Sequence, residues 1–317
     1  MTDAGLVTLA VPCRTDEPAL GRMLAAALAS WRQAPQAART RLEVLVCLNG
    51  PESPAPGAAL RECARLAGAP LARVDIDAPR AVSLPPAAEP VSMVALATRR
   101  VGKPIAWNVL RACARGALVI FVDADVSFAP AAFGRLLDAL AACPDAALAS
   151  AKTTCMARPG RFERIMAAPY GVDFPNLSAQ LYAARVAALP ATMPEDLIEP
   201  ERWLELVLGR ERLVRVPEVL VAVRLPGTLP DFFRQRVRIE MGKVQLAHAY
   251  PGLERRGAPP PPLLATLARL GAGASARLAV YAVLRAAAHT LAWWRYRRGA
   301  TTDIWRQAVS TKQWEGA

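Results

Sequence analysis

Two aspartates stand directly after a run of apolar residues. Asp123 and Asp125 follow the β-prone stretch 118–122, and its unbroken apolar character predicts a strand covered on both faces, as in a parallel sheet. Parallel sheets bind ligands outside the carboxyl ends of their strands. Two carboxylates at that edge can reach one divalent cation, and Mg²⁺ prefers carboxylate and phosphate oxygens. The spacing therefore indicates a metal held against a phosphorylated ligand. The alternative is a strand that simply ends in acidic loop residues.

The elements predicted around these aspartates alternate between strand and helix. Apolar runs bounded by turn residues predict strands at 6–11, 42–48, 72–76 and 118–122. Apolar periodicity and helix-start signals predict helices at 16–31, 58–67, 104–114 and 130–142. Pro12 is expected to close the first strand, and the Pro- and Ala-rich stretch 78–100 is expected to be a loop. This order predicts an α/β fold with a mostly parallel sheet and right-handed crossovers.

Composition limits the class of protein. At 317 residues, with 53% hydrophobic and 21% charged residues, the chain can bury a large core and is not disordered. The net charge of +12 suggests an anionic partner such as a membrane surface, a nucleotide or a nucleic acid, although only four of the 39 basic residues are lysines. The six cysteines lack a C-x-x-C pair, which predicts reduced core residues in a cytosolic protein. No signal peptide is expected, because no basic stretch precedes an apolar core at the N-terminus.

Several short motifs follow one another along the chain. They are Asn49–Gly50, Gly102–Lys103–Pro104 with Ala106 and Asn108, Val122–Asp125, and Gln235–Arg238, an altered Q-x-x-R-W motif. In order and spacing they resemble glycosyltransferase family 2 over residues 5–248. The resemblance implies a GT-A type, Rossmann-like fold, with a mostly parallel sheet flanked by helices and a helical C-terminal appendage. It also implies an inverting enzyme that uses nucleotide-diphosphate sugars.

The resemblance implies a role for each residue at the donor site. Asp123 and Asp125 would bind Mg²⁺ or Mn²⁺, with Asp125 on the metal and Asp123 nearer the ribose of the donor. The metal would bridge the diphosphate and stabilise its charge as the glycosidic bond breaks. Asn49 stands where the family usually carries an aspartate that contacts the base, and asparagine can still hydrogen-bond a uracil edge. The other expected donor-binding residues are Pro12, Asp16, Lys103 and Gln235. For Lys103, the alternative is a solvated surface lysine.

An inverting displacement also needs a carboxylate that takes the proton of the acceptor hydroxyl. The family places an acidic pair just before a helix, and the segment 194–204 offers two registers for it. A literal match selects Glu195 and Asp196, whereas counting back from the helix selects Glu201. Asp196 and Glu201 are therefore the two candidates for the general base. The alternative is that these acids only favour the helix N-terminus through its dipole.

A helix predicted from Asp231 to about Ala247 carries Gln235 and Arg238, which share a face because they are three residues apart. The resemblance places this motif along the acceptor channel and near the diphosphate, so Arg238 is expected to contact the leaving group. Ile239 stands in place of the family's usual tryptophan. The neighbouring basic residues are expected to form a solvated or membrane-facing surface; they are Arg234, Arg236 and Lys243.

The C-terminal region is expected to be separate. Residues 1–250 would form the catalytic domain, with a nucleotide-sugar half at 1–126 and an acceptor half at 127–250, and 251–317 would be helical. Prolines 259–262 are expected to break the chain. The apolar stretch 278–294, interrupted by Arg285 and His289, leads into an aromatic and basic cluster. This stretch is expected to lie on the cytoplasmic face of the membrane. The alternatives are a helix packed on the catalytic domain and a spanning helix.

Three functions compete at this point. The first is a metal-dependent glycosyltransferase, peripheral on the cytoplasmic membrane face, with a lipid-linked or envelope glycan acceptor and no nucleic-acid partner. The second is a haloacid-dehalogenase-like phosphatase, which also presents D-x-D after an apolar strand but usually near the beginning of its domain. The third is a non-enzymatic basic module that binds membrane or nucleic acid. The glycosyltransferase is the prediction that explains the whole series of motifs.

Overall fold

The computed structural model describes residues 2–51, 55–78, 84–87, 89–156, 160–172, 177–254 and 270–299. The chain forms two compact units. Unit 1 comprises Met1–Lys152, Leu177–Asp196 and Glu211–Val221, and unit 2 comprises Thr153–Asn176, Leu197–Arg210 and Ala222–Ala317. The predicted chain break at 259–262 lies outside the described residues.

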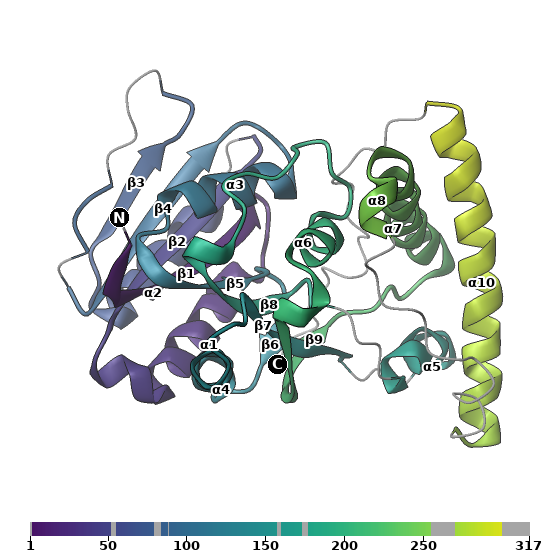
Figure 1. Ribbon diagram of the computed structural model, residues 1–317, viewed down its shortest axis with the longest axis horizontal. Helices are drawn as coiled ribbons and strands as arrows, with labels where there is room; N and C mark the ends of the chain where they lie inside the picture. The colour runs from purple at the N-terminus through teal and green to yellow at the C-terminus, as the bar shows by residue number, and fades with distance from the viewer. Residues whose placement is uncertain are drawn as a thin grey trace. The chain divides into compact units, whose positions relative to one another are not determined.

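A sheet with strand order β3-β4-β2-β1-β5-β8-β7-β9-β6 runs through the fold (Figure 1). The strands are β1 (Asp3–Arg14), β2 (Arg41–Asn49), β3 (Leu71–Asp75), β4 (Val91–Thr98), β5 (Gly116–Val122), β6 (Ser127–Phe128), β7 (Leu148–Cys155), β8 (Leu181–Arg185) and β9 (Leu213–Val223). The first five in spatial order are parallel, and β8 is antiparallel to both β5 and β7. The predicted α/β fold with a mostly parallel sheet is confirmed.

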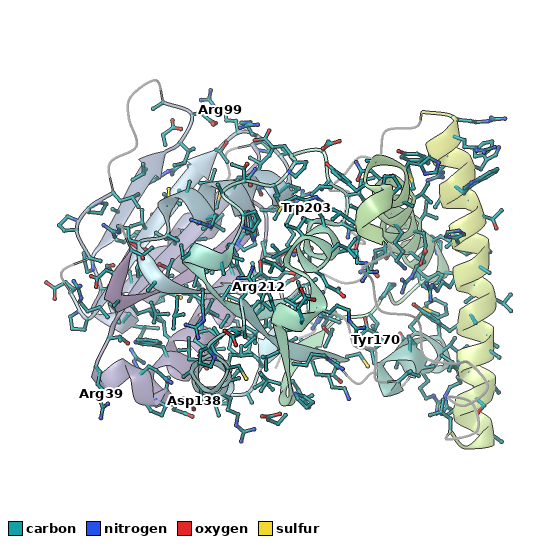
Figure 2. All side chains as sticks on the ribbon, viewed as in Figure 1. Arg39, Arg99, Asp138, Tyr170, Trp203 and Arg212 are labelled. Carbon is teal, nitrogen blue, oxygen red and sulfur yellow. The ribbon has the colours of Figure 1, made fainter. Side chains whose placement is uncertain are left out.

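The helices of unit 1 cover this sheet. They are α1 (Leu20–Gln33), α2 (Ala55–Ala67), α3 (Lys103–Cys113) and α4 (Ala132–Ala142), with a short 3₁₀ turn, η1 (Pro35–Ala38). α1 packs against α2 and α4, and α3 packs against β1 and β2. Each helix buries one apolar side, as Leu24 of α1 and Leu110 of α3 show. On the outer side of α4, Asp138 (Figure 2) accepts a hydrogen bond from Gln36 Nε2 at 2.7 Å.

Unit 2 is largely helical. It contains α5 (Arg161–Ala167), a 3₁₀ turn η2 (Ala168–Gly171), α6 (Pro200–Leu208), α7 (Leu229–Ala249), α8 (Pro251–Glu254) and α10 (Ala272–Arg297). Thr228 caps α7, because its side chain accepts a hydrogen bond from the backbone N–H of Asp231 at 3.3 Å. α10 packs along α7 and against α5 (Figure 1). The helices predicted around 231–247 and 278–294 are thus confirmed.

The beginning of the chain differs from prediction in two places. β1 does not end at Pro12 but continues to Arg14, because the ladder to β5 ends at Ala10 and β1 then pairs with β2 alone. Proline is tolerated where a strand lacks a second neighbour. The next helix begins at Leu20 rather than near residue 16, since residues 15–19 form turns, in which Glu17 Oε1 accepts the N–H of Ala19.

The predicted loop at 78–100 is also wrong, because it contains β4. This strand lies between β2 and β3, and it is buried for most of its length. The prolines and alanines that precede this strand dilute its apolar signal, so the whole stretch was interpreted as a loop.

The six cysteines are free, as predicted, but they are not all in the core. Cys13, Cys47 and Cys63 are buried, whereas Cys143 is exposed at the end of α4. Burial raises the pKa of the Cys47 thiol to about 12, so this thiol stays protonated and unreactive.

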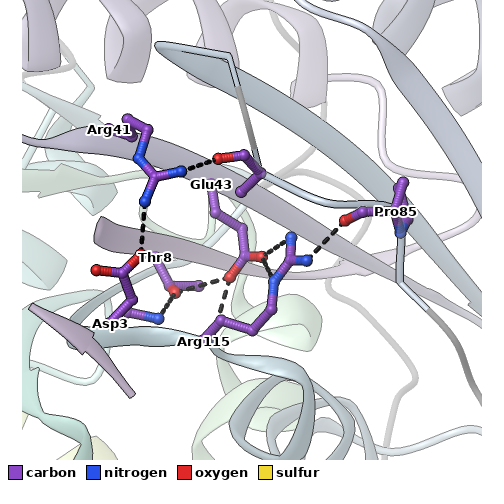
Figure 3. Close-up of polar contacts among 8 residues, drawn as sticks. Asp3, Thr8, Arg41, Glu43, Pro85 and Arg115 are labelled. Atoms are coloured by element: carbon purple, nitrogen blue, oxygen red, sulfur yellow. Dashed lines mark hydrogen bonds and ion pairs between the residues drawn. The ribbon is translucent and has the colours of Figure 1, made fainter. Parts of the chain in front are cut away.

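A buried carboxylate ties three strands together (Figure 3). The side chain of Glu43 on β2 is fully buried, and it accepts hydrogen bonds from Thr8 Oγ1 at 2.9 Å and from the backbone N–H of Arg115 at 3.2 Å. The Arg115 guanidinium also forms an ion pair with Glu43 and donates to the carbonyl of Pro85 at 2.6 Å. These partners offset the desolvation of the carboxylate and join β1, β2 and the start of β5.

Glu43→Ala is expected to lower the free energy of unfolding by about 3 kcal/mol, because Arg115 and Thr8 lose their buried partner. Urea denaturation measures this change. Glu62→Ala is the matched control, since Glu62 pairs with Arg65 in an exposed position on α2 and its removal should leave the unfolding midpoint unchanged. Equal midpoints for the two variants would contradict the role of Glu43.

Candidate active site

The carboxyl ends of parallel strands meet at one edge of unit 1. β4, β2, β1 and β5 are neighbours in that order, so the residues that follow them lie along this edge. The predicted site residues found there are Pro12, Asp16, Asn49, Lys103, Asp123 and Asp125. Asp16, just beyond β1, is exposed and forms an ion pair with Arg14 at 2.8 Å. The structure therefore gathers these predicted donor-binding and metal residues at one edge.

Lys103 and Asp123 form an ion pair at this edge. Lys103 Nζ lies 2.8 Å from Asp123 Oδ1 and also donates to the carbonyl of Ala179 at 3.3 Å. Both side chains are only 21% exposed. The alternative of a solvated surface lysine is therefore wrong, and one of the chain's four lysines stands beside the D-x-D pair.

Asp125 follows in the turn after β5 and is partly exposed. Within the described ranges, no group of three or more His, Cys, Asp or Glu side chains is placed to hold a metal ion. The two aspartates still fit a divalent cation, because Mg²⁺ is usually held by one or two carboxylates together with phosphate oxygens of the substrate.

An aromatic stack supports the strand that carries these aspartates. Phe121 on β5 stacks on Trp107 of α3, with ring centroids 5.6 Å apart, and on Tyr182 of β8, at 5.2 Å. Trp107 Nε1 donates to the Tyr182 hydroxyl at 2.9 Å, so the polar groups of both buried rings are satisfied. The stack fixes α3 and β5 relative to each other, and with them Lys103 and Asp123.

Asn49 ends β2 and is buried. Its Nδ2 donates to the carbonyl of Gly102 at 2.7 Å, immediately before Lys103. The next residue, Gly50, has φ +123°, a conformation that favours glycine, and its N–H donates to the Thr98 carbonyl at 3.0 Å. The Asn49–Gly50 motif thus turns the chain sharply while it stays bonded to β4.

The segment that leads to Asp196 is anchored to α3. Asn108 Nδ2 donates to the carbonyl of Met193 at 2.9 Å, and the N–H of Met193 donates back to Asn108 Oδ1 at 2.8 Å. Glu195 forms an ion pair with Arg100, which follows β4. The roles of Asn108 and Arg100 were not predicted, although both lie within or beside the Gly102–Lys103–Pro104 motif.

The remaining predicted site residues belong to unit 2. Glu201 lies in the first turn of α6, and Gln235 and Arg238 are half-buried on α7. The two helices are held together closely. The N–H of Ile198 donates to Gln245 Oε1 at 3.0 Å, and a Cβ added to Gly242 would clash with the side chain of Glu199. The position of Glu201 relative to α7 is therefore fixed within unit 2.

A second buried carboxylate, missed in the sequence, joins α7 to α10. The side chain of Glu240 is 2% exposed and faces four basic groups. They are Arg236 at 3.6 Å, Lys243 at 3.0 Å, Arg285 at 3.1 Å and His289 at 3.2 Å. Burial alone would raise the pKa of this carboxyl, but the attraction of Lys243, Arg285 and Arg236 lowers it to about 2. Arg236 and Lys243 are four and three residues from Glu240 on one helix, and this spacing could have predicted the ion pairs from the sequence.

Acid should therefore weaken the packing of α10. The Glu240 pKa is about 2 in the folded protein against an ordinary 4.5, so its stabilisation is complete above pH 4.5 and is lost as the pH falls toward 2. Denaturant unfolding at pH 7 and pH 3 is expected to show a loss on the order of 2 kcal/mol that Glu240→Gln does not show. The same pH dependence in both proteins would exclude this contribution.

Comparison with known proteins bears on what this site does. Residues 82–180 match the family model of glycosyl transferase family 2. This segment, about a third of the chain, is therefore similar to the family 2 glycosyltransferases. The match includes Lys103, Asn108, Asp123 and Asp125, and it favours the glycosyltransferase over the phosphatase and the non-enzymatic module. A search of curated proteins found no match.

Solved structures of similar fold show the architecture of the chain. The mannosyltransferase PcManGT from Pyrobaculum calidifontis, in complex with GDP-Man and Mn²⁺, has a TM-score of 0.54 and 20% identity, over 95% of this chain and 81% of that one. Glucosyl-3-phosphoglycerate synthase from Mycobacterium tuberculosis has a TM-score of 0.49 and 16% identity, over 76% and 78% of the chains. TarS from S. aureus, in complex with UDP, has a TM-score of 0.48 and 14% identity, over 74% and 64%. The GT-A type fold predicted from the sequence is confirmed by the first of these.

Proposed function

We propose that this protein is a metal-dependent, inverting glycosyltransferase that moves a sugar from a nucleotide-diphosphate sugar to an acceptor hydroxyl. The observation that carries the proposal is the half-buried Lys103–Asp123 ion pair with Asp125 beside it, at the carboxyl edge of the sheet and inside the segment that matches the family. One ammonium and two carboxylates suit a diphosphate and the divalent cation that accompanies it.

The residues at the strand ends and on α7 have separate roles in this proposal. The diphosphate is the leaving group, and its negative charge grows as the bond to the anomeric carbon breaks. Lys103 would supply positive charge for it, and Asp125 would hold the cation, whose charge would neutralise part of that of the diphosphate. Arg238 is the leaving-group contact expected from the resemblance. Pro12, Asp16 and Gln235 complete the expected donor set.

The acceptor side requires one proton transfer. The acceptor hydroxyl attacks the anomeric carbon from the face opposite the leaving diphosphate, which inverts the configuration in a single displacement. Asp196 or Glu201 takes the hydroxyl proton as the new bond forms. Asp196 is in the anchored segment of unit 1, and Glu201 begins α6 in unit 2.

Nucleotide binding tests the proposal directly. Thermal unfolding is measured with UDP and with GDP, each in the presence of Mn²⁺ and of EDTA; GDP is included because PcManGT was solved with GDP-Man. One nucleotide with Mn²⁺ should stabilise the protein by about 2.7 kcal/mol at a hundred times its dissociation constant. No stabilisation by either nucleotide would contradict the proposal.

We further propose that α10 lies on an anionic membrane surface, where a lipid-linked or envelope glycan acceptor would be found. None of the helices in the described ranges is long and apolar enough to span a bilayer.

α10 exposes several large apolar side chains. One side of the helix packs on α7. At other positions, Val280 is 46% exposed, Val283 70%, Trp293 41% and Trp294 46%. The helix has no acidic residue. Arg297 and Arg298 stack on the two tryptophans, at 4.1 and 4.0 Å from the ring centroids. Exposed tryptophans beside arginines are typical of a membrane interface.

Replacing both Trp293 and Trp294 by Ser is expected to reduce binding to anionic vesicles by about tenfold or more, because partly inserted aromatic surface is lost. Sedimentation with vesicles of acidic lipid measures this, and added salt should weaken the binding of the unaltered protein. Leu66→Ser is the control, since Leu66 is 54% exposed and lies on α2 in unit 1. No vesicle binding by the unaltered protein would contradict the membrane proposal.

A further inference from the structure

The contacts of the Asn49 side chain indicate a role other than binding a nucleobase. Its Nδ2 donates to the carbonyl oxygen of Gly102 at 2.7 Å, and the whole residue is 1% exposed. The same carbonyl accepts the N–H of Ala106 at 3.1 Å, which is the first hydrogen bond of α3. Asn49 therefore adds a second donor to the carbonyl at which α3 begins.

The orientation of this amide follows from its partner. A carbonyl oxygen accepts hydrogen bonds, so the amide nitrogen must face Gly102 and the amide oxygen must point away. Asn49 Oδ1 is buried and has no hydrogen-bond partner among the described residues. An unpaired buried acceptor is unfavourable. Because that oxygen is itself buried, a nucleobase does not reach it in this arrangement of the chain.

The hydrogen bond from Asn49 to Gly102 connects the end of β2 to the residue before Lys103. Asn49 is held in the sheet between Arg14 on β1 and Thr98 on β4, which are its partners in the strand register. Lys103 follows Gly102 directly, and its Nζ lies 2.8 Å from Asp123 Oδ1. A shift of the Gly102 carbonyl moves the first turn of α3 and with it the ammonium.

We infer that Asn49 is a positioning residue: it holds the Gly102 carbonyl, fixes the start of α3 and thereby keeps the Lys103 ammonium against Asp123. The inference rests on the proposed donor site only for its effect on nucleotide binding. An aspartate at position 49 would place a carboxylate against the Gly102 carbonyl, and two acceptors repel each other. The asparagine is what permits this bond.

Two variants and two measurements test the inference. Asn49→Asp keeps the shape but removes the donor, and Asn49→Ala removes the donor without adding charge. The first measurement is the acetylation rate of Lys103 by mass spectrometry without nucleotide, with Lys152 as the internal reference. The second is the dissociation constant of UDP and of GDP with Mn²⁺.

Both variants are expected to raise the acetylation rate of Lys103 relative to Lys152, and to weaken whichever of UDP and GDP binds by about three- to tenfold, the equivalent of one hydrogen bond. Wild-type reactivity of Lys103 in both variants would overturn the inference. So would tighter UDP binding by Asn49→Asp, because it would show a base contact. The acetylation result stands even where no nucleotide binds, so failure of the proposed function is distinguishable from failure of the inference.

Discussion

Asp125→Ala is expected to abolish metal-dependent binding of the nucleotide donor and to leave the fold intact. Asp125 follows β5 in a partly exposed turn, so its removal creates no cavity in the core. Its neighbour Asp123 is already paired with Lys103. Loss of residues that merely support a metal ligand lowers metal affinity by about 10- to 100-fold, and loss of a direct ligand should exceed this. Isothermal titration of UDP and GDP, with and without Mn²⁺, measures the effect.

Asp138→Ala is the matched control for this substitution. It removes the same charge from an exposed position of unit 1, where Asp138 accepts a hydrogen bond from Gln36 of η1. The control should bind nucleotide and Mn²⁺ like the unaltered protein. If Asp125→Ala does the same, the proposed metal site is wrong.

Replacement of the general base is expected to have the second large effect. Either Asp196→Asn or Glu201→Gln should lower turnover by about 10²- to 10⁴-fold, the usual contribution of a positioned proton acceptor. Donor affinity should stay near normal, because the base acts on the acceptor. Turnover at saturating donor and acceptor measures the effect, and nucleotide titration checks the binding.

Glu195→Gln serves as a comparison for these two variants. Glu195 forms an ion pair with Arg100, which gives it a structural partner at the end of β4. It is expected to reduce turnover less than the base does. If both Asp196→Asn and Glu201→Gln keep full turnover, the base lies elsewhere, and Glu195 and Glu199 are the next carboxylates to test.

The strands and the D-x-D pair could be predicted because their signals are local. The apolar run before Asp123 is continuous, and β1 and β2 have equally clear apolar runs. β4 was missed because its apolar residues follow directly on a stretch rich in proline and alanine, which was interpreted as a loop. Local patterns therefore predicted β1, β2, β3 and β5, but not β4 or the later strands β6, β7, β8 and β9.

The contacts that shape the site could not be predicted, because they join residues far apart in the sequence. The bond from Asn49 to Gly102 and the pair between Lys103 and Asp123 depend on the order of β4, β2, β1 and β5 in the sheet. The partners of Glu240 on α10 likewise depend on how two helices pack. The order of the motifs identified most of these residues, but it did not show which of their atoms contact one another.

The anchor at Met193 has a consequence for how the sequence of this segment can change. Asn108 binds only main-chain atoms of Met193, so the anchor does not depend on which side chains occupy positions 194–196. A carboxylate can therefore be removed, introduced or shifted by one position in this segment without moving its point of attachment. Under the proposed function, a different acid can therefore be introduced in this segment, while Asn108 itself must be left unchanged.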